Sequence, residues 1–244
     1  MKPLPFDHEH FNQMNFILTG TSRGIGYDTA LELAAYPEHQ ILAISRNEAR
    51  LQTLVDTAAE RYGHRNLSYL AADLTQLDRT ALLAAIEPLG QIHGLVNNAG
   101  LLINKPFEDL TAADWQRLFA TNLFGVVELL QTIAPYLVQA HILNIGSMGG
   151  FQGSSKFPGL SAYSASKAAL ANLTECLAEE WKDRGHRVNC LALGAVQTEM
   201  LTAAFPGFEA PVSSAEMGAQ VVWFLLNGHR IFNGKVLPVS VSTP

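Results

Sequence analysis

Cysteine is scarce in this chain, which has only Cys176 and Cys190 among its 244 residues. The first lies in a helix-like stretch and the second in a strand-like stretch, without the spacing of metal ligands. The composition therefore fits a reducing compartment, not a disulfide-rich secreted protein.

Positive charge is also in short supply, since 16 Lys and Arg face 22 Asp and Glu, for a net charge of −6. No run of like charges stands out. A protein with this balance has no basic field to attract a phosphate backbone, so we expect no nucleic-acid partner.

Long unbroken apolar runs are missing too. The longest, such as 221–226, cannot span a bilayer, and residues 1–13 carry acids and prolines where a signal peptide needs an apolar core. We expect a cytoplasmic protein without a membrane partner, whose segment 1–13 is extended or flexible. The one close histidine pair, His8 and His10, lies in that segment, and no metal site is predicted.

Linkers, repeats and low-complexity tracts are absent, and the pattern that remains is an alternation of short apolar runs with amphipathic ones. This pattern is typical of a parallel sheet covered by helices, so a single doubly wound α/β domain over 1–244 is predicted. The expected strands are Asn15–Leu18, Gln40–Ile44, Leu67–Ala71, His93–Val96, His141–Ile145, Arg187–Leu191 and Val236–Val239. Helical spacing is clear at Leu51, Leu54, Val55 and Ala58, and at Trp115, Leu118 and Phe119. Segments 151–161 and 199–214 are expected to be irregular.

Three glycines, Gly20, Gly24 and Gly26, follow the first expected strand and precede a helix-like run. Glycine lets a backbone approach a pyrophosphate closely, and the helix that follows offers unpaired amides and the positive end of its dipole. The spacing G-x-x-x-G-x-G is weak evidence alone, because a bare glycine-rich turn would look the same.

Four further motifs occur in order after successive strands: Asp73, the run Asn97–Gly100, Ser147, and Tyr163-Ser-Ala-Ser-Lys167. Together with the glycine turn they closely resemble the short-chain dehydrogenase/reductase family, over nearly the whole chain from Asn15 onward. The resemblance implies a seven-stranded Rossmann sheet with helices on both faces, a nicotinamide dinucleotide cofactor, and a homodimer or homotetramer. The changed C-terminal tail leaves the form of the oligomer open.

The resemblance also implies which residues contact the dinucleotide. They are Gly20, Ser22, Arg23, Gly24, Ile25, Gly26, Ser45, Arg46, Asp73, Leu74, Asn98, Ala99, Gly100, Tyr163, Lys167, Gly194, Val196 and Thr198. Asp73 would meet the adenine; the alternative is that it caps the helix that follows, and both roles can coexist.

Charge after the second strand decides between the two nicotinamide cofactors. An acid there holds the ribose hydroxyls of NAD, whereas a 2′-phosphate needs a cation. This chain has Ser45-Arg46 and no acid, with Arg23 as a second cation in the glycine turn. We therefore predict NADP(H) in preference to NAD(H), the alternative being that these arginines are solvated surface charges.

Tyr163 and Lys167 are four residues apart, which places them on one face of a helix. The ammonium group, assisted by the positive nicotinamide of the oxidised cofactor, is expected to lower the pKa of the phenol. By resemblance, Tyr163 is the general acid and base, Ser147 holds the substrate oxygen, Lys167 binds the ribose, and Asn122 supports a water relay. Each role has a structural alternative. Ser147 could be a turn residue, Asn122 a surface amide in mid-helix, and Tyr163 a core aromatic.

The chain departs from the family pattern near the substrate. The stretch from Ser147 to Tyr163 is long, and the extra loop places Lys156 or Phe157 at the site or bulges into solvent. The usual Pro-Gly is Leu193-Gly194 here. Segment 199–214, the expected substrate lid, is apolar, with Met200, Leu201, Phe205 and Phe208 as expected pocket walls, and no Lys, Arg or His occurs between 188 and 228.

These features predict an NADPH-dependent carbonyl reductase, formally a reversible alcohol dehydrogenase, acting on a small neutral or hydrophobic substrate. One alternative is reduction of a 3-oxoacyl group on acyl-carrier protein, although the acidic carrier would need basic residues that the lid lacks. An alternative of another class is a noncatalytic NADP(H) sensor or scaffold.

Overall fold

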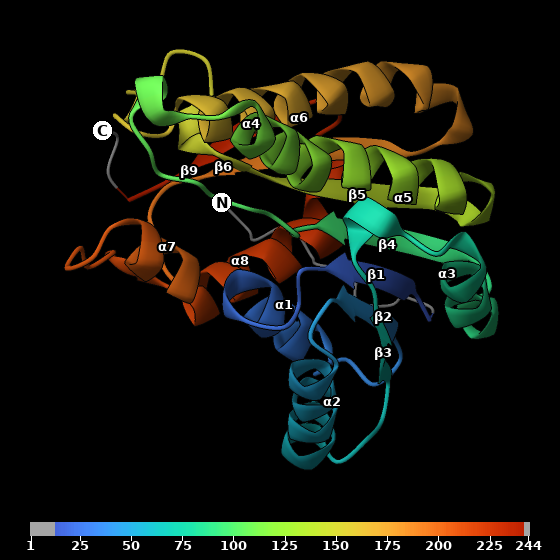
Figure 1. Cartoon of the computed structure of the whole chain (residues 1–244). Coiled ribbons are helices and arrows are strands. Elements are labelled where there is room, and N and C mark those ends of the chain that lie inside the picture. Colours follow the sequence, from blue (N-terminus) through green and yellow to red (C-terminus); the bar gives the residue numbers. More distant parts are fainter. Residues whose placement is uncertain (1–12, 242–244) are drawn as a thin grey trace, which may run out of the picture.

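The computed structural model describes residues 13–241, which form one seven-stranded parallel sheet in the order β3-β2-β1-β4-β5-β6-β9 (Figure 1). The strands are β1 Asn15–Thr19, β2 Gln40–Ser45, β3 Leu67–Ala71, β4 Ile92–Asn97, β5 Leu137–Ser147, β6 Arg187–Leu193 and β9 Val236–Val239. All seven predicted strands are confirmed, although β5 begins four residues before the predicted start at His141. Segment 1–13 lies outside the described residues except for its last position.

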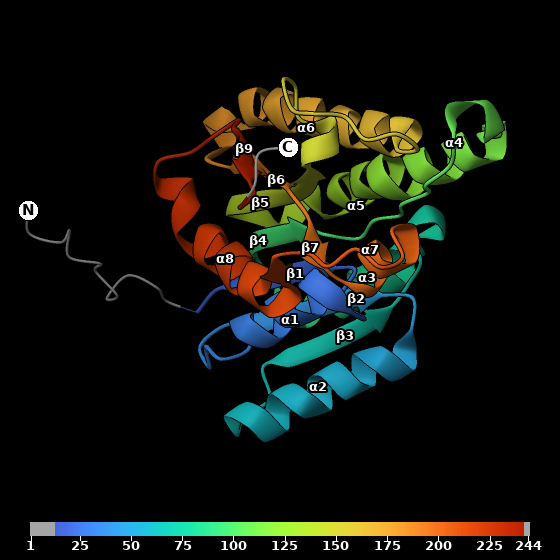
Figure 2. The same ribbon diagram turned by 90° about the vertical axis from the view of Figure 1, so that its left-hand side faces the viewer.

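Helices cover both faces of the sheet, as predicted (Figures 1 and 2). One core contains buried residues of α1 Gly24–Leu33, α2 Glu48–Tyr62 and α8 Ser214–Asn227. The other contains those of α3 Arg79–Ile86, α5 Gly125–Ile133 and α6 Ser161–Glu180. The helical spacing in α2 is confirmed, because Leu51, Leu54 and Ala58 are its buried residues.

A π-helical segment over Ala120–Phe124 joins α4 Ala112–Phe119 to α5. By length and composition alone, the combined stretch Ala112–Tyr136 could cross a membrane, although polar residues interrupt its apolar ones. Its apolar composition has a local cause, since the inward side chains of α5, such as Leu129 and Ile133, are fully buried against the sheet.

The predicted irregular segments differ from each other in the structure. Residues 151–160 form loop and turn, as expected, before α6 begins. Segment 199–214 is more ordered than predicted: it contains α7 Glu199–Ala204 and the short strand β8 Val212–Ser213, which pairs with β7 Val196–Gln197. The Thr198 side chain caps α7 by accepting a bond from the Leu201 amide at 3.2 Å, which gives this helix a defined start.

The strand order reverses direction between β1 and β4, since β2 and β3 lie on one side of β1 and β4, β5 and β6 on the other. In open α/β sheets a crevice forms at this point, outside the carboxyl ends of the strands. The glycine turn follows β1 and the Asn97–Gly100 motif follows β4, so both predicted motifs lie at the reversal.

His141 of β5 is a buried imidazole that the fold holds neutral. Its Nδ1 donates to the Leu225 carbonyl at 2.8 Å, and its Nε2 accepts from Asn189 Nδ2 at 3.1 Å. Burial lowers the pKa of His141 to about 4 from its ordinary value of 6.5. Burial is also the first cause of lowered pKa values at four other histidines, His39, His93, His186 and His229.

We therefore expect the free energy of unfolding to fall as the pH drops below about 6.5. Below this pH the histidines bind protons in the unfolded chain but stay neutral in the folded one. His141 alone should contribute a loss of about 2 kcal/mol at pH 5, and the contribution should be fully present above pH ~6.5. Urea unfolding at pH 7 and pH 5 measures it. His141→Gln should reduce the pH dependence, and an unchanged dependence in that variant would contradict the assignment.

Candidate active site

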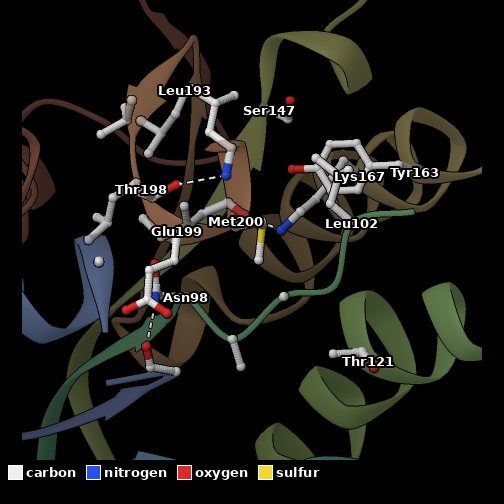
Figure 3. A pocket seen from close by; sticks show the side chains of 18 of the residues that line it. Asn98, Leu102, Thr121, Ser147, Tyr163, Lys167, Leu193, Thr198, Glu199 and Met200 are labelled. Carbon is white, nitrogen blue, oxygen red and sulfur yellow. Dashed lines mark hydrogen bonds between the residues drawn. The ribbon is translucent and has the colours of Figure 1, made fainter. Parts of the chain in front are cut away.

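A cavity of about 600 Å³ opens at the carboxyl ends of the strands, between the glycine turn, α6 and the 199–214 segment. Every predicted site residue lines it except Gly26 and Asn122, which lie behind its wall. Figure 3 shows Ser147, Tyr163 and Lys167 on one side of this cavity and Thr198, Glu199 and Met200 of the 199–214 segment on another.

The glycine turn is packed too closely for side chains. Gly20 has a φ of 71° and Gly24 a φ of 57°, both in the left-handed region that favours glycine. A Cβ on Gly26 would lie 2.3 Å from the Gly20 carbonyl oxygen and 2.3 Å from Asn98 Nδ2. That amide holds the turn in place by donating to the carbonyls of Thr19 at 3.1 Å and Gly20 at 3.0 Å.

The start of α1 fits an anion such as a pyrophosphate. Arg23, at the N-cap position, makes no side-chain capping bond. The first backbone amides of α1 therefore have no N-cap side chain as a partner. Gly24 and Ile25 of this turn line the cavity. A close backbone approach, unpaired amides and a cavity of this size together fit a dinucleotide held by its phosphates.

Charged side chains gather at the end of the cavity beside β2. Arg46 is 77% exposed and its Nη1 lies 3.8 Å from Asp73 Oδ2. Asp73 also accepts bonds from the amide and hydroxyl of Thr75, at 2.9 and 2.8 Å, and so caps the short helix Leu74–Gln76. Asp73 therefore lines the cavity and caps a helix at the same time.

Sequence reasoning missed two residues of this charged group. Glu199 bonds to Arg23 at 2.6 Å and to Arg50 at 3.1 Å. These partners are 176 and 149 residues from Glu199 along the chain, so no local spacing could have indicated the contact.

Lys167 lies in α6, is buried, and donates from Nζ to the Ile145 carbonyl at 2.7 Å. Burial lowers the pKa of Lys167 to about 8. For Tyr163, burial raises the pKa, and a hydrogen bond with Ser147 partly offsets this. Lys167 is not among the causes of this shift. The expected lowering by Lys167 together with the oxidised nicotinamide therefore stays a prediction.

Asn122 is fully buried in the π-helical segment, so the alternative of a surface amide is wrong. Its Oδ1 accepts from the Leu101 amide at 2.8 Å, and its Nδ2 donates to the Leu101 carbonyl and to Ser166 Oγ, both at 2.9 Å. Ser166 in turn donates to the Tyr163 carbonyl at 2.7 Å. The side chain thereby ties the chain that leaves β4 to the helix that carries Tyr163.

The extra loop before α6 contributes an aromatic ring and not a charge. Lys156 donates to the carbonyls of Gly149 at 2.9 Å and Phe151 at 2.6 Å, which turns its ammonium into the loop. Phe157 lines the cavity. Of the alternatives stated for this loop, the structure supports Phe157 at the cavity and excludes Lys156 from its wall.

One wall of the cavity is apolar. Met200, Leu201, Phe205 and Phe208 of the 199–214 segment all line the cavity, as expected, and Leu102, Met148 and Leu160 complete this wall. Among the described residues that line the cavity, the cationic side chains are Arg23, Arg46 and Lys167. The hydrophobic side chains of this wall and the hydroxyl groups of Ser147 and Tyr163 line the same cavity.

Comparison with known proteins gives a consistent picture. A family model described as short chain dehydrogenase matches residues 15–207. An L-xylulose reductase from Caenorhabditis elegans is 34% identical over 195 residues, covering 78% of this chain and 74% of the relative. A 3-oxoacyl-(acyl-carrier protein) reductase from Aggregatibacter actinomycetemcomitans is 34% identical over 196 residues, covering 78% and 79%. The solved structure of a short chain dehydrogenase from Burkholderia cenocepacia J2315 in complex with NADP aligns with a TM-score of 0.81 at 27% identity, covering 94% of this chain and 97% of the other.

Proposed function

The chain belongs to the short-chain dehydrogenase family and has its α/β fold, and from this premise we propose that it reduces a neutral or hydrophobic carbonyl compound with NADPH. The observation that carries the proposal is the placement of Ser147, Tyr163 and Lys167 in one cavity, between a glycine turn fit for phosphates and an apolar wall. Members of the family are oxidoreductases that act on alcohol and carbonyl groups.

Tyr163 is the proton donor in this proposal. Its raised pKa keeps the phenol protonated at neutral pH, as an acid that protonates a carbonyl oxygen must be. Ser147, which shares a hydrogen bond with Tyr163, would hold the same oxygen. NADPH, when bound, supplies the hydride that the carbonyl carbon accepts.

Lys167 and Asn122 would support the proton donor. With a pKa of about 8, Lys167 is mainly an ammonium ion at pH 7, able to bond a ribose hydroxyl and to favour the phenolate when the reaction runs toward oxidation. Asn122 is a positioning residue, because its bonds reach Leu101 and Ser166 and not the cavity.

The substrate class follows from the apolar wall. Phe157 and Phe205 bring aromatic surface to the cavity. Its two guanidinium groups, those of Arg23 and Arg46, belong to the glycine turn and to the end of β2, so they suit the dinucleotide and not an anionic substrate. The 34% identity to a 3-oxoacyl-(acyl-carrier protein) reductase keeps that activity as the second candidate, for which a thioester substrate is the test.

A substrate panel tests the proposal directly. NADPH oxidation, followed by loss of its absorbance, should require a ketone or aldehyde and should be faster with hydrophobic carbonyls than with phosphorylated ones. Turnover only with a 3-oxoacyl thioester would favour the second candidate. Dinucleotide binding without turnover on any carbonyl would favour the noncatalytic sensor.

The cofactor preference has its own test in Arg46→Ala. We expect kcat/KM for NADPH to fall about 10- to 100-fold, with NADH little affected, because a charge-assisted bond to the 2′-phosphate contributes about 1.5–3 kcal/mol. Arg65→Ala removes an exposed arginine just before β3, remote from the cavity, and should change neither value. Equal losses with both dinucleotides in Arg46→Ala would contradict a role in 2′-phosphate recognition.

A further inference from the structure

Glu199, the first residue of α7, bridges two arginines from different parts of the chain. Its Oε2 lies 2.6 Å from Arg23 Nη1, and its Oε1 and Oε2 lie 3.1 and 3.3 Å from Arg50 Nη1. Arg23 precedes α1 and Arg50 lies in the first turns of α2. The hydrogen bond from Arg23 is the first cause of a lowered Glu199 pKa, so the side chain is an anion at neutral pH.

This bridge lies where a 2′-phosphate would be recognised. Arg23, Arg46 and Glu199 all line the same cavity, together with Ser45 at the end of β2. Figure 3 shows Glu199 beside Thr198 at the cavity wall. A Cβ on Gly24 would meet Thr198 Cγ2 at 3.3 Å, so the start of α7 already packs on the glycine turn and brings the Glu199 carboxylate to the arginines.

The charges in this cluster nearly balance without any ligand. Three arginines, Arg23, Arg46 and Arg50, face two carboxylates, Asp73 and Glu199, which leaves a surplus of one positive charge. A phosphate monoester carries about −1.5 to −2 at neutral pH. Three arginines with Asp73 alone would match that charge, whereas Glu199 adds an uncompensated negative charge beside it.

We infer that Glu199 is a specificity-determining residue that weakens the preference for a 2′-phosphate, because its carboxylate occupies guanidinium donors of Arg23 and Arg50. The inference deepens the proposed function, since it concerns the same dinucleotide site. Arg23 lines the cavity, so removing the negative charge frees its donors for the phosphate and takes away a like charge. Both effects shift selectivity from the 2′-hydroxyl form toward the 2′-phosphate form.

The expected size is modest, because the three side chains are about half exposed, at 49% for Arg23, 52% for Glu199 and 47% for Arg50. Solvent and salt screen such contacts. For one unit charge acting on a phosphate across a few ångströms near a protein surface, a change of about five- to tenfold in affinity is reasonable. The effect should shrink in 0.5 M salt, since the Debye length is then only about 4 Å.

The experiment measures binding of two cofactor fragments and needs no turnover. Dissociation constants of 2′,5′-ADP and 5′-AMP are determined by calorimetry for the wild type, Glu199→Gln and Glu209→Gln. Glu209 is a matched control, because it lies in the same segment, is exposed and forms no ion pair within residues 13–241. Glu199→Gln should bind 2′,5′-ADP about five- to tenfold more tightly than the wild type, with 5′-AMP unchanged, and Glu209→Gln should match the wild type.

Arg50→Met tests the bridge from its other end. If Arg50 takes part, the gain from Glu199→Gln should be smaller in the Arg50→Met background, as a double-mutant cycle would show. An unchanged ratio of the two affinities in Glu199→Gln, or an equal gain in Glu209→Gln, would overturn the inference. A wild type that binds both fragments equally would contradict the proposed NADPH preference but not this inference, which concerns the change caused by Glu199.

Discussion

Replacing Tyr163 by Phe is expected to lower kcat for carbonyl reduction by about 100- to 10,000-fold, the range that positioned general acids contribute. The variant keeps the aromatic ring and loses only the hydroxyl, whose interaction in the structure is the hydrogen bond with Ser147. Dinucleotide affinity and thermal stability should therefore remain close to those of the wild type. Steady-state kinetics with NADPH, together with dinucleotide titration of the same sample, measure both.

Tyr136→Phe provides the matched control. Tyr136 is half-buried in the short helix Ala134–Tyr136, before β5, and does not line the cavity. It should retain full activity. Turnover by Tyr163→Phe at the wild-type rate would mean that another group protonates the substrate, and the roles proposed for Ser147 and Lys167 would need to be reassigned.

Replacing Gly26 by Ala is expected to disrupt dinucleotide binding and stability together. The added Cβ would lie 2.3 Å from the Gly20 carbonyl oxygen, a backbone atom that can move away only if the glycine turn moves. Overpacking of this kind costs about 1–3 kcal/mol, occasionally more. Because 1.4 kcal/mol corresponds to a factor of ten, dinucleotide affinity should fall about 5- to 150-fold when this cost is paid in the conformation that binds the dinucleotide.

Gly63→Ala separates this steric effect from a simple backbone effect. Gly63 ends α2 with a φ of 73°, and a Cβ added there would have nothing within 4 Å. The substitution therefore costs only the left-handed conformation, about 1–2 kcal/mol. Urea unfolding should show destabilisation in both variants, but dinucleotide titration should show weakening only in Gly26→Ala. Normal binding by Gly26→Ala would show that the turn tolerates a side chain.

The sequence by itself determined the order of the strands along the chain and the location of the chemistry. Buried parallel strands appear as short apolar runs, so all seven were found, and motifs that follow successive strands must meet at one edge of a parallel sheet. Strand geometry alone placed the glycine turn at this edge, whereas Asn98, Ser147 and Tyr163 were assigned to the site by the resemblance to the short-chain dehydrogenase/reductase family. All four line one cavity. The start of β5 was missed, and the structure shows an irregular beginning to this strand: Gln139 has a φ of 43°, and the pairing with β4 shifts register between Ile92 and Gly94.

Only the tertiary structure decided the contacts between residues far apart in sequence. Burial raises the pKa of Tyr163, and its effect depends on everything packed around the phenol. The burial of Asn122, the inward turn of Lys156 and the bridge from Glu199 to Arg23 and Arg50 likewise depend on side chains brought together by folding. Local sequence patterns indicate which face of a helix or strand is buried and where a turn occurs. The partner of a charge or an amide is set by three-dimensional packing, which the spacing of residues along the chain does not indicate.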